Sequence, residues 1–387
     1  MTDTVIVDAV RTPIGRANKG SLVDVRPDDM AALVVDTLLQ RHPELPRTSV
    51  DDVICGVSGA AGEQAYNLGR IVGQLAGLPD TVPGTTVNRF CASSLQALRM
   101  AHHAVQAGEG DTFVVVGVES VTRRAAAFAP ADLNPRMIDH GRPDFVNDMY
   151  ISMIETAERV ATQYGVTREE MDEFALLSQT RAVAARDDGS FAREIVPVPV
   201  AAGAVVERDD GPRPGTTLAK LAALNPIQGE GGRVTAGNAC PMNDGAAAAV
   251  VMSAERAAEL GIQPRARILG SHVTGLAPEV MGLGPIEATR GLLNRLGLKI
   301  TDVDVVEVNE AFAAQVLPVC RELGIDIAEQ LNPFGGAIAL GHPYGMTGVR
   351  MVTTLLNGLD STDGSVGLAT LCIGGGQGMA MLIERLG

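Results

Sequence analysis

The sequence predicts an α/β fold that is built from two similar halves. Apolar, strand-like runs alternate with helical patterns, which is the order typical of sheets covered by helices. The order helix, strand, strand, helix and strand occurs once in the first third of the chain and again in the last third. In each half a reactive side chain, Cys91 or His342, stands at the same spacing before an arginine, Arg99 or Arg350. Together these observations indicate an old internal duplication.

The first half begins with a helix. Pro27 opens it, because proline at the first helical position followed by acidic residues marks a helix start. A strand is expected at 52–54 and another at 84–87, where an apolar run gives way to a helical pattern near Cys91. The apolar run at 113–117 has the character of a strand that is buried on both faces.

The second half repeats these elements. Pro285 opens the matching helix, 304–306 is the matching strand, and the helix that begins at His342 is followed by a strand at 366–370. If a pseudo-twofold axis relates the halves, Cys91 and His342 occupy equivalent helix starts. The two side chains would then face each other across the junction between the halves, although they are remote in sequence.

A central stretch from 122 to 235 fits neither half. It contains proline-rich pieces, charged loops and two helical patterns, at 155–164 and 168–184. Such a composition is typical of a linker or an insertion. A chain of 387 residues is long enough for two core-forming units, so we expect two halves with an insertion between them.

The composition is that of a protein from a reducing compartment. Hydrophobic residues make up 46% of the chain but aromatic residues only 3%, so aliphatic side chains must fill the core. The five cysteines are an odd number and show neither paired nor metal-ligand spacing. Asp3 and Asp8 interrupt the only apolar run near the N-terminus, and no apolar run is long enough to span a bilayer. A cytoplasmic protein is expected.

Cys91 is the first candidate for chemistry. It lies at a strand-to-helix junction, where helix N–H groups and the helix dipole favour the nucleophilic thiolate. Most free cysteines are instead small buried hydrophobic residues, so other segments must decide whether Cys91 is reactive or structural. Three distant motifs stand beside glycines or at the end of apolar runs: Asn309-Glu310-Ala311-Phe312, Gly335 to Pro343, and Cys372 to Gly378. A cysteine with a distant histidine and a second cysteine is a reasonable set of nucleophile, base and acid.

With the N-terminal run that includes Arg11-Thr12-Pro13, these motifs resemble the thiolase family, whose members cleave or form 3-oxoacyl-CoA thioesters. The resemblance covers nearly the whole chain. It implies two packed βαβαβαββ units in an α/β/α/β/α sandwich with an inserted loop domain. The implied boundaries are 1–121 for the N-terminal half, completed by about 236–264, then 122–235 for the loop domain that covers CoA, and 265–387 for the C-terminal half.

The resemblance also implies catalytic roles. Cys91 would attack the C3 carbonyl, and His342 would take its proton. Cys372 would protonate the departing acetyl-CoA carbanion and then deprotonate the incoming CoA, tasks that a thiol with an ordinary pKa of about 8.5 suits. The N–H groups of Gly374 and Cys91 would form one oxyanion hole, and His342 with a water held by Asn309 would form the other.

Contacts with CoA are expected from two further residues. Arg213 matches a family position near the adenine and phosphates, and Cys240 stands beside the pantetheine where the family usually has serine. The net charge of −15 argues against nucleic acid as a partner, but it also opposes binding of the polyanion CoA, so local basic residues must outweigh it. No metal and no redox cofactor is implied, since CoA is a co-substrate. A homodimer or homotetramer is expected.

Two positions depart from the family pattern. Ser94 and Ile154 stand where the family usually has glycine, and both are expected to add volume near the acyl chain or the pantetheine. Four aromatic residues flank the motifs and are candidates for walls of the acyl pocket, although core packing explains them equally well: Phe90, Phe312, Phe334 and Tyr344. The acyl substrate therefore stays open, from a linear chain to a bulky ring-bearing group.

The expected reaction is thiolytic cleavage of a 3-oxoacyl-CoA to acetyl-CoA and a shortened acyl-CoA, in the degradation of lipids or fatty acids by β-oxidation. Three alternatives stay open: a biosynthetic thiolase that condenses two acetyl-CoA units, a ketoacyl-synthase-type condensing enzyme, and a CoA-thioester binding protein without activity. Condensing enzymes of the second kind lack a counterpart of Cys372. A dinucleotide-binding fold is disfavoured because no Gly-x-Gly-x-x-Gly follows an N-terminal strand.

Overall fold

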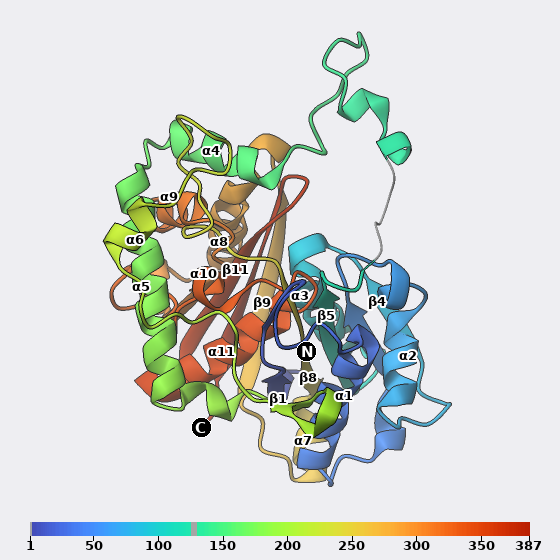
Figure 1. Ribbon diagram of the computed structural model, residues 1–387. Coiled ribbons are helices and arrows are strands. Elements are labelled where there is room, and N and C mark those ends of the chain that lie inside the picture. The colour runs from blue at the N-terminus through green and yellow to red at the C-terminus, as the bar shows by residue number, and fades with distance from the viewer. Residues whose placement is uncertain (1, 125–129) are drawn as a thin grey trace.

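The structure is a computed structural model that describes residues 2–124 and 130–387 (Figure 1). Within these residues, ten strands form one mixed sheet and two short strands pair separately. The strands are β1 (Thr4–Arg11), β2 (Gly15–Arg16), β3 (Asp52–Gly56), β4 (Gly84–Val87), β5 (Thr112–Ser120), β6 (Val198–Pro199), β7 (Val205–Val206), β8 (Asn243–Ser253), β9 (Ala266–Gly275), β10 (Val305–Val308), β11 (Val366–Ile373) and β12 (Gln377–Arg385). The α-helices are α1 (Pro27–Arg41), α2 (Leu68–Leu75), α3 (Ser93–Ala107), α4 (Met153–Gln163), α5 (Arg168–Asp187), α6 (Leu218–Ala222), α7 (Ala254–Leu260), α8 (Gly284–Leu296), α9 (Ala313–Leu323), α10 (Ala337–Leu340) and α11 (Thr347–Thr362).

The order of the elements confirms the predicted duplication. The first unit runs β1, α1, β3, α2, β4, α3, β5 and β8, and the second runs β9, α8, β10, α9, α11, β11 and β12. The pairings also repeat: β5 is parallel to β3 and antiparallel to β8, which is antiparallel to β1, and β11 has the same relations to β10, β12 and β9. The counterpart of β4 in the second unit is a single parallel bridge between Val306 and Leu331.

The two units are joined through their first strands, a connection that the sequence did not indicate. Val5 of β1 lies opposite Arg267 of β9, and Ile6 lies opposite Ala266, in antiparallel register. The strand order is therefore β10-β11-β12-β9-β1-β8-β5-β3-β4, with β2 attached to β8. Because β1 and β9 are equivalent strands, this junction relates the units as the pseudo-twofold predicts.

Five layers result from this arrangement. α3 and α11 lie between the units, whereas α1 and α2 cover the outer face of the first unit and α8 and α9 that of the second (Figure 1). Along β5, Phe113 and Val115 belong to the central core, while Val114 and Val116 belong to the outer core beneath α1. Both faces of β5 are buried, as its continuous apolar sequence predicts. The predicted α/β/α/β/α architecture is confirmed.

The starts of α3 and α11 pack directly against each other. The Val349 N–H donates to Ser94 Oγ at 3.1 Å, which joins the two helices by a hydrogen bond. A Cβ at Gly348 would lie 2.2 Å from the Leu95 nitrogen, so only glycine permits this approach. The two helix starts that follow Cys91 and His342 are thereby held face to face.

The chain between β5 and β8 packs mainly on the second unit. Both predicted helices form as α4 and α5, and the capping box of Thr167 and Glu170 begins α5. Val160 and Phe174 from these helices share an outer core with Val316 of α9. The segment 130–150, drawn in teal at the top of Figure 1, extends away from the rest of the molecule.

A buried ion network fixes this central region to the first unit. The Arg11 guanidinium is fully buried and contacts Glu194 Oε1 at 2.5 Å and Asp209 Oδ1 at 2.7 Å. The N-terminal motif that carries Arg11 is therefore structural, because removing the cation would leave two buried carboxylates unpaired.

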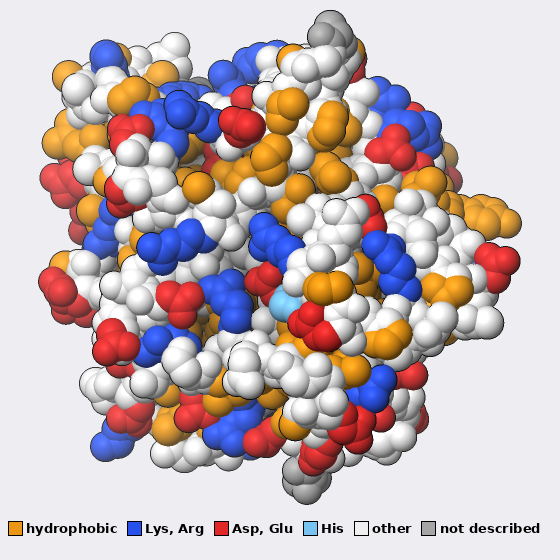
Figure 2. Space-filling model, turned by 90° about the horizontal axis from the view of Figure 1, so that it is seen from below, with side chains coloured by type: hydrophobic (Ala, Val, Ile, Leu, Met, Phe, Trp, Pro, Cys, Tyr) orange, Lys and Arg blue, Asp and Glu red, His pale blue; other side chains and the backbone are white. Residues whose placement is uncertain are grey.

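The surface carries no segregated charge on the face shown in Figure 2, where acidic and basic side chains are interspersed. On this face, a site for a polyanion would depend on individual arginines and lysines and not on a broad basic surface. None of the helices within 2–124 and 130–387 is both long and apolar enough to cross a bilayer.

Candidate active site

Cys91 lies in a tight turn between β4 and α3. Phe90 adopts the left-handed region with φ 45°, and its N–H donates to Asn88 Oδ1 at 2.8 Å. The turn continues as a 3-10 helix from Phe90 to Ala92, after which α3 begins. This geometry places the partly exposed Cys91 at the end of a strand and the start of a helix, as its sequence context predicts.

Two opposing effects act on the protonation of Cys91. Burial raises the pKa of the Cys91 thiol to about 12, although the Gly374 N–H faces the sulfur and lowers that pKa, as does the N–H of Cys91 itself. The N–H groups favour the thiolate, as expected, but desolvation of the charged form outweighs them. Attack by the Cys91 sulfur would therefore need a base.

His342 has the properties of that base. Its ring is buried, and burial lowers its pKa to about 3, with a further contribution from the positive charge of Arg350. His342 Nδ1 lies 2.7 Å from Thr347 Oγ1, and the Thr347 hydroxyl donates to the Pro343 carbonyl at 2.8 Å. Since the hydroxyl proton is already used, Nδ1 carries the ring proton and Nε2 presents a lone pair.

Asn309 and Cys372 reach the same place from neighbouring strands. Val308, the last residue of β10, is paired with Thr370 of β11, and β11 continues to Ile373, with Cys372 opposite Gly378 of β12. The Asn309 amide nitrogen lies 3.3 Å from His342 Nε2, in direct contact. Burial raises the pKa of the Cys372 thiol, as do the neighbouring Cys91 and Cys240, which favours the protonated thiol.

The fold thus gathers groups that are remote in sequence. Gly374 faces Cys91, Asn309 contacts His342, and Cys91 and Cys240 lie close enough to Cys372 to raise its pKa. The glycine turn between β11 and β12 is required for this arrangement, because Gly376 has φ 78° and a Cβ there would lie 2.2 Å from the Leu276 carbonyl oxygen.

Comparison with known proteins places the chain in a family. Its residues 4–255 match the thiolase N-terminal domain, and residues 262–385 match the thiolase C-terminal domain. This chain belongs to the thiolase family. A crystal structure of the Bacillus anthracis acetyl-CoA acetyltransferase is similar to this thiolase, with a TM-score of 0.92 and 39% identity over 100% of this chain and 99% of that one.

Several curated relatives match the thiolase over its full length. The beta-ketoadipyl-CoA thiolase of Pseudomonas putida and the 3-oxoadipyl-CoA/3-oxo-5,6-dehydrosuberyl-CoA thiolase of Escherichia coli K12 are each 46% identical over 100% of both chains. The 3-ketoacyl-CoA thiolase of Aeromonas salmonicida is 43% identical over 100% of both chains. This thiolase is therefore an acyltransferase that acts on CoA thioesters.

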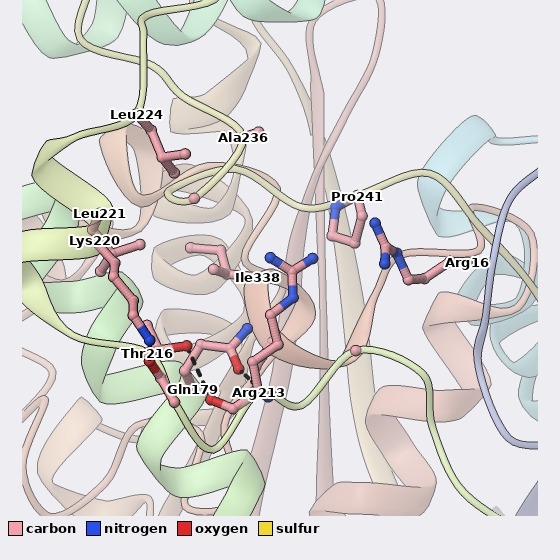
Figure 3. A pocket seen from close by; sticks show the side chains of 14 residues that line it. Arg16, Gln179, Arg213, Thr216, Lys220, Leu221, Leu224, Ala236, Pro241 and Ile338 are labelled. Carbon is pink, nitrogen blue, oxygen red and sulfur yellow. Dashed lines mark hydrogen bonds between the residues drawn. The ribbon is translucent and has the colours of Figure 1, made fainter. Parts of the chain in front are cut away.

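A groove of about 350 Å³ leads toward the catalytic groups (Figure 3). Arg213 and Arg16 lie on either side of Pro241 in this view, and Lys220 comes from α6. Burial lowers the pKa of Arg213, and the nearby Arg16 lowers it further, so a negatively charged ligand would relieve the repulsion between the two guanidinium groups. Arg16 and Lys220 were not predicted, because neither lies in a recognisable motif.

The inner end of the groove adjoins the catalytic residues. Pro241, which lines it, follows Cys240, and Ala339 of α10 lies three residues before His342. Cys240 is partly exposed, its N–H donates to the Ala311 carbonyl at 3.0 Å, and burial raises its pKa to about 12. Of the two expected CoA residues, Arg213 lines the groove, whereas Cys240 is next to the lining residue Pro241 in the chain.

The structure corrects the expectation for Ser94. Ser94 is buried in the contact between α3 and α11, where it cannot add volume to an acyl pocket. Ile154 and Met153 both pack on the core of the second unit that contains Cys372, and Met153 Sδ lies 3.7 Å from a Cβ built on Gly374. The error for Ser94 arose because position along the chain does not define the direction of a side chain.

Two structural carboxylates hold the motifs in place. Glu310 accepts hydrogen bonds from Ser178 Oγ at 2.6 Å and from the Ile338 N–H at 3.1 Å, so it organises α10 and does not enter the reaction. Glu119, at the end of β5, accepts from the Gly345 N–H at 3.0 Å. Neither Glu119 nor Thr347, which orients His342, had been singled out, because each acts through contacts that only the fold creates.

The raised pKa of Cys91 leads to a pH prediction. Only the thiolate reacts with iodoacetamide, so alkylation of Cys91 in the free enzyme should keep rising about tenfold per pH unit from about pH 6 to about pH 10, with no plateau near the ordinary value of about 8.5. The rate is measured by mass spectrometry of the peptide that contains Cys91. A plateau at or below neutral pH would show a preformed thiolate and contradict the assignment.

Proposed function

We propose that the protein cleaves a 3-oxoacyl-CoA with free CoA, through a covalent acyl group on Cys91. The observation that carries the proposal is that two N–H groups, of Gly374 and of Cys91, face the Cys91 sulfur. Donors in this position stabilise the oxyanion of a thioester that forms there. The neutral His342, whose unprotonated Nε2 contacts the Asn309 amide, supplies the base.

In the first half-reaction, His342 Nε2 takes the proton of the Cys91 thiol as the sulfur attacks the C3 carbonyl. The C2–C3 bond breaks, and the electron pair stays on C2 of the departing acetyl-CoA. The Cys372 thiol donates a proton to this carbanion, which leaves the acyl group on Cys91 and a thiolate on Cys372. The amide of Asn309, which lies at His342 Nε2, polarises the same region.

In the second half-reaction, the Cys372 thiolate takes the proton of an incoming CoA thiol. The CoA sulfur attacks the thioester on Cys91, and the shortened acyl-CoA leaves. The Cys91 sulfur regains its proton from His342, which restores the starting state. CoA is the co-substrate, and no step uses a metal or a redox cofactor.

The groove in Figure 3 is the proposed path for CoA. Arg16, Arg213 and Lys220 would bind the phosphates, and the apolar residues Leu221 and Leu224 would line the path of the less polar part. With CoA bound in this way, its thiol would pass Cys240 and reach Cys372. The proposed loop domain, 122–235, supplies one wall of this groove through Gln179 and the residues around Arg213.

The relatives' names suggest which acyl groups to assay first. Relatives that are 46% identical are named for 3-oxoadipyl-CoA, or for both 3-oxoadipyl-CoA and 3-oxo-5,6-dehydrosuberyl-CoA. These thioesters carry a carboxylate at the far end of the acyl chain, which a fatty acyl substrate of β-oxidation does not. We therefore propose 3-oxoadipyl-CoA as the first substrate and degradation as the direction.

Rapid mixing without free CoA tests the covalent mechanism. Mixing the protein with 3-oxoadipyl-CoA alone should release a burst of acetyl-CoA of about one equivalent per site, because the acyl-enzyme cannot turn over without CoA. Mass spectrometry should find a succinyl group on Cys91, and added CoA should remove it. Acetyl-CoA release that begins only after CoA is added would contradict the ping-pong order.

Biosynthetic condensation is the second candidate, because a solved structure at 39% identity is that of an acetyl-CoA acetyltransferase. The same residues would serve both directions, since the steps are reversible. Comparing the kcat/KM for two acetyl-CoA units with that for 3-oxoadipyl-CoA and CoA decides between the two roles.

A further inference from the structure

Tyr344 packs beside His342. The two rings are edge to face, with centroids 5.0 Å apart. Burial raises the pKa of Tyr344, and the next contributions come from Cys240 and Cys91, which places the phenol close to both thiols. In a chain with only 3% aromatic residues, this ring therefore lies near the sulfur that would hold the acyl group.

Arg124 lies over this ring. Its guanidinium carbon is 5.7 Å from the centroid of Tyr344, within the range of a cation–π contact. Gly59 makes room for the arginine, because a Cβ there would lie 2.9 Å from Arg124 Cδ. The side chain is 32% exposed, so it is neither fully solvated nor sealed in the core. A positive charge is thus held above the wall of the pocket.

Glu119 is a carboxylate partner of Arg124 only at long range. Arg124 Nη1 is 3.9 Å from Glu119 Oε1, so the charges attract each other without a hydrogen bond. The buried Glu119 carboxylate already accepts hydrogen bonds from the N–H groups of Ser58, Gly59 and Gly345, each at 3.0 Å. Glu119 therefore has its own hydrogen-bond donors, and it does not occupy the N–H donors of Arg124.

The opposite side of the pocket is apolar. Met149 Sδ and Phe90 Cε2 lie 3.2 and 3.9 Å from a Cβ built on Gly375, and Met153 approaches Gly374. A methyl-terminated acyl chain could rest against these side chains. The pocket therefore has one apolar side and one side with a cation, and the cation distinguishes acyl groups by the charge at their far end.

We propose that Arg124, supported by Tyr344, is a specificity-determining residue that binds a carboxylate at the far end of the acyl chain. This inference rests on the proposed function. In a 3-oxo-dicarboxylic acyl group of six carbons, only three C–C bonds of about 1.5 Å each separate the carbonyl attacked by Cys91 from the terminal carboxylate carbon. A long arginine side chain beside the pocket spans the remaining gap and offers paired donors to the carboxylate.

Arg124→Leu tests this assignment with two substrates of equal length. 3-Oxoadipyl-CoA and 3-oxohexanoyl-CoA both have six acyl carbons, and they differ in a terminal carboxylate against a methyl group. Because a hydrogen bond to a charged group is lost, the ratio of their kcat/KM values should fall by roughly 10- to 100-fold in Arg124→Leu. Arg124→Lys, which keeps the charge but not the paired donors, should recover part of the ratio.

Arg123→Leu is the matched control. Arg123 is adjacent in sequence, but its Nε and Nη2 bind the two oxygens of Glu63 at 2.7 Å each, away from Tyr344. The ratio should stay at its wild-type value in this variant. Thermal unfolding of all variants and their activity on 3-oxohexanoyl-CoA show whether each one folds, and Arg124→Gln replaces Arg124→Leu if the latter does not.

The outcomes separate this inference from the function on which it rests. A wild-type protein that cleaves neither thioester overturns the proposed function. A wild-type protein that cleaves both, with a ratio that Arg124→Leu leaves unchanged or that Arg123→Leu lowers equally, overturns only the role of Arg124. A wild-type preference for 3-oxohexanoyl-CoA over 3-oxoadipyl-CoA also overturns it.

Discussion

Cys91→Ser is expected to lower kcat by at least about 10⁴-fold, the scale of loss when a covalent nucleophile is removed. Serine keeps the size of the side chain, but its hydroxyl is far less acidic than a thiol. His342 would therefore have to take a proton from a group that holds it much more tightly than the Cys91 thiol does. The measurement is the steady-state rate with 3-oxoadipyl-CoA and CoA, together with mass spectrometry for an acyl adduct.

Cys320→Ala is the matched control for this variant. Cys320 is a buried thiol of α9 that packs in the outer core of the second unit. Its loss should change stability slightly and leave turnover near that of the wild type. Substantial activity in Cys91→Ser, or an acyl adduct on another cysteine, would remove Cys91 from the centre of the mechanism.

Cys372→Ala is expected to separate the two half-reactions. Without the thiol, the departing acetyl-CoA carbanion has no positioned proton donor, so release of acetyl-CoA should slow by roughly 10²- to 10⁴-fold. The acyl group should still accumulate on Cys91, because Gly374 and His342 are intact. Its transfer to CoA should be slow as well, since the base for the CoA thiol is missing.

Quenched-flow experiments that follow acetyl-CoA release and the mass of the Cys91 peptide distinguish this pattern. A slow burst with a persistent adduct supports separate roles for the two cysteines. Complete loss of the adduct, as in Cys91→Ser, would show that Cys372 is needed for the attack itself. Wild-type rates for both steps would show that Cys372 is not the acid.

The fold could be predicted from local patterns because each pattern has a local cause. Pro27 and Pro285 start helices through their fixed backbone angle, and the apolar run of β5 is buried on both faces. The junction between β1 and β9 was not predictable in the same way. Pairing of Val5 with Arg267 depends on how two complete units meet, which no short segment encodes.

Some residues of the candidate site could likewise be predicted from local sequence, whereas the placement of others depends on the fold. Cys91, His342 and Cys372 stand in motifs with glycines and strand ends, so their sequences indicate reactive groups. The direction of Ser94 was predicted wrongly, because it depends on the packing between α3 and α11. Arg16 approaches Arg213 only in the folded chain, and no spacing in the sequence relates them.

The sequence by itself determined which elements form, that they occur twice, and which side chains can carry chemistry. Only the tertiary structure decided the protonation state of those side chains. Burial makes Cys91 a neutral thiol and His342 a neutral base, because a low-dielectric interior disfavours charge. The charge held by Arg124 over Tyr344 was likewise decided by folding, since it depends on a gap at Gly59. The sequence shows which ionisable side chains are present, whereas burial and neighbouring charges in the folded protein determine their protonation states.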